Sequence, residues 1–156
     1  SYVEDLWTRA QSKIGLWMQG QLLLSVFVAL LVYVPMLVLG MPYAALLAIL
    51  AFFGELIPVV GLTFATIPAL FLAYAYGGLP MLGIVALIYF IISQLENHVL
   101  YPRVMNKMVG VPSVVVIIAL VVGIKFAGIW GAILAVPLAS ILMELVSDLE
   151  KRKNVV

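Results

Sequence analysis

The chain has 156 residues, of which 66% are hydrophobic and 10% are charged, and its mean hydropathy is +1.27. Soluble domains contain about half apolar and about a quarter charged residues, so this composition excludes an ordinary soluble globule and predicts an integral membrane protein. A net charge of +1 without a basic stripe does not favour nucleic-acid binding, and the absence of cysteine excludes disulfides, thiolate metal sites and a cysteine nucleophile.

Residues 1–21 predict an amphipathic helix at the membrane interface. Trp7 and Trp17 belong to its apolar face, while Arg9 and Lys13 lie on the opposite face. The alternative is a connecting helix that packs on another subunit or domain. Residues 22–39 are an apolar run without charge and predict the first transmembrane helix, which needs about 20 residues.

Residues 43–76 contain two apolar stretches that are each short for a membrane crossing. Residues 43–53 would form a helix of about 17 Å, whereas the hydrocarbon layer is about 30 Å thick. The segment between the two stretches, residues 54–61, contains Glu55, Pro58 and two glycines. This pattern predicts a re-entrant helical hairpin whose tip lies within the membrane.

Residues 81–95 predict a second full transmembrane helix, which ends in the polar residues of 94–98 and is followed by a polar segment with Arg103 and Lys107. Residues 113–143 again form two short apolar stretches, interrupted at 123–128, and predict a second re-entrant hairpin. The expected fold is therefore an all-α integral membrane protein with a transmembrane domain at 22–143. The charged residues 144–156 are expected to form a cytoplasmic tail.

Glycine and proline positions indicate an inverted repeat within the transmembrane domain. Repeat one covers 22–76 and repeat two covers 81–143. Three matches occur in the same order at an offset of 70 or 69 residues: Gly40-Met41-Pro42 with Gly110-Val111-Pro112, Gly54 with Gly123, and Ile67-Pro68-Ala69 with Val136-Pro137-Leu138. Transporter folds often contain such weak internal symmetry.

The basic residues indicate the topology. They cluster at 9–13, 103–107 and 151–153, whereas the turns at 40–42 and 77–80 are uncharged. The positive-inside rule then places the three basic flanks in the cytoplasm, so the two hairpins open to opposite sides. Two full spans in place of each hairpin would leave the same flanks inside, and only the segment lengths favour the hairpins.

Glu55 is the most informative residue, because a carboxylate within an apolar run is costly and is a functional candidate by default. Pro58 and Gly61 beside it free backbone carbonyls, which is tolerated at membrane depth where the backbone lines a cavity. We therefore expect Glu55, Pro58 and Gly61 to line a transport path for a small molecule or a cation. The alternatives for Glu55 are a loop in water and a structural pair with another helix.

Lys125 lies at the corresponding break of the second repeat. It would bind an anionic group, pair with Glu55 or extend its ammonium group to the interface. Gly128 and Gly131 lie along the same path, and we expect them to serve close helix packing rather than ligand contact.

Gln94, Glu96 and Asn97 would form the polar path at the cytoplasmic side, although such a cluster also marks a water boundary. His98 is no metal candidate, because the chain has no second histidine. We expect no catalytic residues, no metal and no cofactor, and hence no enzyme.

Four segments resemble the autoinducer-2 exporter (PerM-like permease) family, and together they cover essentially the whole chain. They are 20–23, 55–61, 94–103 and 128–139. The resemblance implies a bacterial inner-membrane protein that exports a quorum-sensing signal, and some members of the family are described as sodium/proton antiporters. It also implies further N-terminal spans, so that this chain is similar to the C-terminal half. Relatives often have asparagine at the position of His98, and no role is assigned to it.

These observations predict an inner-membrane transporter that exports a small molecule, such as an autoinducer-2-like signal, by alternating access. The alternatives are a sodium/proton antiporter that uses Glu55 and a non-transporting membrane scaffold. The expected partners are membrane lipid, a small-molecule substrate or cation, and further copies of the chain in a homo-oligomer, with no nucleic acid.

Overall fold

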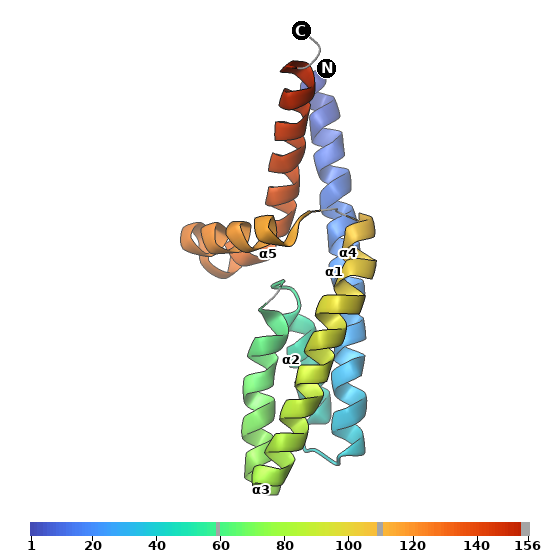
Figure 1. Ribbon diagram of the computed structural model, residues 1–156, viewed down its shortest axis with the longest axis vertical. Helices are drawn as coiled ribbons and strands as arrows, with labels where there is room; N and C mark the ends of the chain where they lie inside the picture. Colours follow the sequence, from blue (N-terminus) through green and yellow to red (C-terminus); the bar gives the residue numbers. More distant parts are fainter. Residues whose placement is uncertain (59, 109–110, 154–156) are drawn as a thin grey trace. The chain divides into compact units, whose positions relative to one another are not determined.

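The computed structural model describes residues 1–58, 60–108 and 111–153, and its elements over these ranges are all helical (Figure 1). In chain order they are α1 (Tyr2–Val38), α2 (Ala44–Gly54), α3 (Gly61–Leu95), the π-helix η1 (Glu96–Leu100), α4 (Tyr101–Met108) and α5 (Ser113–Lys153). Val59 of the predicted first tip, Gly110 of the predicted repeat and residues 154–156 of the predicted tail lie outside the described residues, as do the side chains of Lys107 and Arg152.

The all-α prediction is confirmed, since no strand occurs in the described ranges. Three helical stretches are long and apolar enough to cross a membrane: Tyr2–Val38, Gly61–Met105 and Val114–Lys151. The expected interfacial helix and the first span form one continuous helix, α1, because only Gly20 weakens the helix where they meet. Likewise, α5 continues to Lys153 through most of the expected tail.

Residues 21–104 form one compact unit with its own apolar core. Val28 and Val32 of α1, Leu47 of α2, and Ala69 and Ala73 of α3 are completely buried in it. The alanines on α3 allow the helix axes to approach closely. In a membrane this close packing stabilises helix association, because no hydrophobic driving force acts between helices in lipid. This core determines the position of the residues that join α2 to α3.

The joint between α2 and α3 is closed by two glycines. A Cβ atom on Gly61 would lie 2.0 Å from the carbonyl oxygen of Gly54, and a Cβ atom on Gly54 would lie 2.6 Å from that of Gly61. Only residues without a side chain allow this approach. Farther along, α3 reverses its direction at Gly78, where φ is +64°, so that residues 61–77 and 79–95 form two arms (Figure 1).

Residues 1–20 and 105–156 form the other compact unit, in which α5 also folds back on itself. The reversal falls at Gly128, where φ is +59°, and Figure 1 shows the change of direction. A Cβ atom on Gly131 would lie 1.8 Å from the carbonyl oxygen of Gly123. Each of the two turns is thus closed by a pair of glycines, and the predicted repeat aligns Gly54 of the first turn with Gly123 of the second. The depth of these turns in a membrane and their inverted orientation stay predictions.

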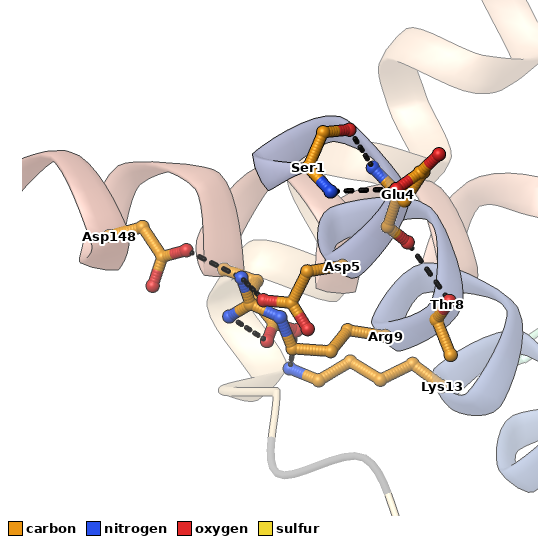
Figure 2. A network of polar contacts seen from close by, with 8 residues as sticks. Ser1, Glu4, Asp5, Thr8, Arg9, Lys13 and Asp148 are labelled. Atoms are coloured by element: carbon orange, nitrogen blue, oxygen red, sulfur yellow. Dashed lines mark hydrogen bonds and ion pairs between the residues drawn. The ribbon is translucent and has the colours of Figure 1, made fainter.

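A network of ion pairs joins α1 to the end of α5 within this unit (Figure 2). The guanidinium of Arg9 lies 3.0 Å from Asp5, 3.2 Å from Glu144 and 3.0 Å from Asp148, and the ammonium of Lys13 lies 2.8 Å from Glu144. The predicted polar face of residues 1–21 therefore binds acidic side chains of α5. The membrane-interface location of residues 1–21 stays a prediction.

Candidate functional site

Glu55 is the first residue after α2 and is buried, with only 1% of its surface exposed. Its backbone N–H donates to the carbonyl of Ala51, which completes the last turn of the helix. The backbone N–H of Leu62, in the first turn of α3, interacts with its carboxyl group. The N–H groups of a first helical turn have no partner within the helix, so they favour a carboxylate at this place.

Gln21 of α1 completes the turn from the opposite side. Its side-chain Nε2 donates a hydrogen bond to the backbone carbonyl of Glu55, and both side chains are buried. One turn later, the hydroxyl of Ser25 donates to the carbonyl of Gln21 over 2.7 Å. Gln21 thus satisfies a carbonyl that the break leaves without a helical partner. Sequence reasoning gave it no role, although an amide at the start of an apolar run was a signal.

Glu96 meets Glu55 at this point. It is the first residue of η1 and is 6% exposed, and its carboxyl group lies within hydrogen-bonding distance of that of Glu55. A π-helix adds a residue to a helical turn and often occurs at functional sites. The structure therefore brings together two acids that are 41 positions apart in the sequence.

The other residues of the predicted polar path are turned outward. Gln94 and Asn97 are exposed, and the amide of Asn97 donates to the hydroxyl of Ser93 over 3.3 Å. His98 is exposed as well, with Nδ1 at 3.0 Å from the carbonyl of Gln94. Of the polar cluster that follows the second arm of α3, only Glu96 enters the protein interior.

A cleft of about 380 Å³ lies between the two arms of α3. Its polar lining consists of Thr63, Thr66, Tyr89, Ser93, Glu96 and Asn97. The buried hydroxyl of Tyr89 has no hydrogen-bond partner among the described residues. This lining offers hydroxyl, amide and carboxyl groups to a small polar molecule, and sequence reasoning missed its threonines, Ser93 and Tyr89.

The residues assigned to the second break belong to the other unit. Lys125 is exposed, Gly128 forms the turn of α5, and Gly131 makes the close contact with Gly123. For both glycines a packing and turn role therefore has direct structural support. A pair between Lys125 and Glu55 stays a prediction. Pro58 is fully buried at the first break, as Gly61 is.

The candidate site contains two acidic side chains, one amide and several hydroxyl groups. No group of three His, Cys, Asp or Glu side chains able to hold a metal ion occurs in the described part of the chain. Long apolar helices around a buried polar centre are typical of an all-helical membrane protein.

The particular family follows from sequence comparison. A profile of the family described as "AI-2E family transporter" matches residues 1–151, and the chain belongs to this family. The chain is 27% identical to YdbI of Bacillus subtilis over 88% of its length, 30% identical to YrrI of the same organism over 83%, and 38% identical to MT0215 of Mycobacterium tuberculosis over 64%. Each of these relatives is named "Putative transport protein".

The chain covers only part of these relatives, namely 39% of YdbI, 36% of YrrI and 27% of MT0215. The matched region nevertheless contains Glu55, Glu96 and Gln21, because the family profile runs through all three positions.

Proposed function

We propose that this chain is part of a secondary transporter that exports a small polar molecule, similar to the autoinducer-2 signal, by alternating access. The burial of Glu55 at the break between two apolar helices carries the proposal. A buried acid in a membrane protein is costly to maintain and typically marks a substrate or ion path. The family name and the names of the relatives support transport.

The substrate enters the cleft between the arms of α3, beside the buried acid. The cleft of about 380 Å³ suits a small molecule, and its polar side chains include Thr66, Ser93 and Asn97. These groups donate and accept hydrogen bonds without carrying charge, which favours a neutral hydroxylated compound over an anion. Movement of the helices around the glycine-closed turns would then expose the cleft to either side in turn.

The transporter resides in the bacterial inner membrane and assembles as a homo-oligomer. Its basic flanks, which include Arg9, Arg103 and Lys151, face the cytoplasm, in accordance with the positive-inside rule. The two glycine-closed turns then lie at the tips of re-entrant hairpins with inverted orientation, as in transporters built from inverted repeats.

Substrate and ion flux in proteoliposomes tests the proposal. Glu55→Gln preserves shape and hydrogen bonding but removes the charge. We expect it to insert normally and to lose the dependence of flux on pH or cation gradient. The matched control is Glu150→Gln, which removes an exposed acid at the end of α5 and preserves flux. Superimposable flux–pH profiles for the wild type and Glu55→Gln would contradict the assignment of Glu55.

A second function, sodium/proton antiport, is favoured by one observation. Within the described residues of the unit 21–104, no basic side chain is paired with the buried carboxyls of Glu55 and Glu96, so a mobile cation would neutralise them. Sodium-driven proton flux without any organic substrate would distinguish this function from export. Wild-type liposomes that move neither ions nor signal molecules would leave only a scaffold role.

A further inference from the structure

We propose that Glu55 and Glu96, together with the amide of Gln21, form one site that holds a single positive charge, a proton or a sodium ion, between the two carboxyl groups. The inference deepens the proposed function and rests on it, because it identifies the partner of Glu55 and the number of charges that the site binds. Its three members come from α1, from the end of α2 and from η1.

The first observation is the contact between the two acids. Glu55 is 1% exposed, Glu96 is 6% exposed, and their carboxyl groups are within hydrogen-bonding distance. Two buried carboxylates at this distance repel each other strongly, since little water screens them. A proton shared between them, or a cation bound by both, removes that repulsion. Pairs of acids that share one proton are well known in enzyme active sites.

The second observation is a set of buried oxygen atoms without partners. Oε1 of Glu55 and Oε1 of Gln21 are both inaccessible to solvent and accept no hydrogen bond within the described structure. The Gln21 oxygen shares its carbon with the amide nitrogen that binds the Glu55 carbonyl, so both oxygens lie at the same break. A buried polar atom without a partner costs about 1–3 kcal/mol, and a bound ion or water that contacts both oxygens would remove this cost.

The third observation is the way in which the chain directs Glu96 inward. The two residues after it, Asn97 and His98, are exposed, so η1 buries one polar side chain and leaves its neighbours outside. The wider π-helical turn changes which side of the helix each residue faces. The irregular turn therefore serves the contact between Glu96 and Glu55.

The number and type of ligands select a monovalent ion. Two carboxylates and one amide oxygen provide hard oxygen donors, which suit an alkali cation as well as a proton. A dedicated site for Ca²⁺ takes six to eight oxygen ligands, often from several acids. No third acidic side chain joins the pair in the described residues. One sodium ion that enters therefore releases one proton, and the charge of the site is unchanged by the exchange.

Few other titratable groups face the pair. Tyr101 of α4 is close enough to interact electrostatically with Glu96, and Tyr89 of α3 is buried nearby on the cleft wall. His98 and Arg103 are exposed. A change in Tm between acidic and neutral pH that is lost when either Glu55 or Glu96 is replaced therefore originates from the pair.

Thermal unfolding of the whole protein in detergent tests the site without requiring transport. In one arm, sodium chloride replaces choline chloride at constant ionic strength and alkaline pH. In the other arm, the pH is lowered without sodium. A ligand that binds the native state raises the Tm as its concentration increases. We expect a rise in both arms, with a smaller sodium response at acidic pH because the two ions compete.

Isosteric variants assign the response to the pair. Glu55→Gln and Glu96→Gln each lose most of the shift, and the double variant loses no more than either single one, because the two residues act as a unit. Glu150→Gln retains the full shift. Gln21→Leu preserves both acids and weakens the sodium response more than the proton response. This variant tests the site if Glu55→Gln or Glu96→Gln does not fold.

Several results would overturn the site. They are a wild type with no response in either arm, a Glu96→Gln variant that responds like the wild type, and losses in the two single variants that simply add. A response to acid alone supports the pair with a proton as its occupant. Normal binding in a protein that transports nothing would refute the proposed function and leave the site intact.

Discussion

Replacing Gly61 by alanine tests the close approach on which the first turn depends. The added Cβ atom would lie 2.0 Å from the Gly54 carbonyl oxygen and 2.7 Å from the backbone nitrogen of Glu55. Non-bonded carbon–oxygen contacts are about 3.3 Å or longer, so α2 and α3 must separate by about 1.3 Å. The atoms in conflict belong to the backbone, which cannot move aside as a flexible side chain does.

The cost follows from what this separation disturbs. Ala51, Leu62 and Ala65 are buried beside the turn, and a gap of this size forfeits much of their dispersion energy. Overpacking of a core typically costs about 1–3 kcal/mol. We therefore expect Gly61→Ala to lower the free energy of unfolding by about 2–3 kcal/mol. Gly54→Ala should cost less, because its Cβ atom would lie 2.6 Å from the nearest oxygen.

The assay is equilibrium unfolding in mixed micelles, followed by helical circular dichroism, with Gly83→Ala as the matched control. Gly83 lies within α3 and has no atom within 4 Å of its added Cβ. Alanine at an open helical position stabilises by up to about 1 kcal/mol relative to glycine. The two variants should therefore change stability in opposite directions. Equal stability of Gly61→Ala and Gly83→Ala would refute the close contact.

Three further predictions concern other parts of the chain. Gln21→Met leaves the Glu55 carbonyl without its donor and should destabilise by about 1–3 kcal/mol in the same unfolding assay, and a neutral result would contradict this hydrogen bond. Arg9→Gln should lower the Tm at low salt, with a difference that shrinks in high salt as screening increases; a difference that is independent of salt would exclude the ion pairs as its cause. Cysteines at Val60 and Ala127 should react slowly with bulky impermeant reagents, since both are predicted to lie deep at the hairpin tips, and fast labelling of Val60→Cys from the cytoplasm would refute the first hairpin.

The local breaks of the chain were predictable from the sequence. Residues 43–53 were predicted as a short helix and α2 covers Ala44–Gly54, while the expected interruption at 123–128 contains the turn residue Gly128. Glycine and proline act through the backbone of their own segment, so such signals need no knowledge of the remaining fold. The helix α5 continues through the charged residues to Lys153, because Glu, Lys and Arg are good helix formers and no breaker stands before them.

The partners of the candidate residues were not predictable in this way. Glu55 was singled out because any acid in an apolar run is conspicuous, yet its contacts with Gln21 and Glu96 span 34 and 41 positions. The pairs of Arg9 with Glu144 and Asp148 span 135 and 139 positions. Glu96 looked like one member of a water-boundary cluster, and only the π-helical turn separates it from its exposed neighbours.

The sequence by itself determined the class of this protein: long apolar helices, breaks at glycine and proline, and a rare acid that had to be buried or hydrated. Those properties depend on composition and on neighbours within a few residues. Which acid meets Glu55, and which amide closes the turn, was decided only by the tertiary structure. The physical reason is that burial and pairing depend on how distant helices pack, and packing of α1 and α3 around the Gly54–Gly61 contact places Gln21 and Glu96 at one point.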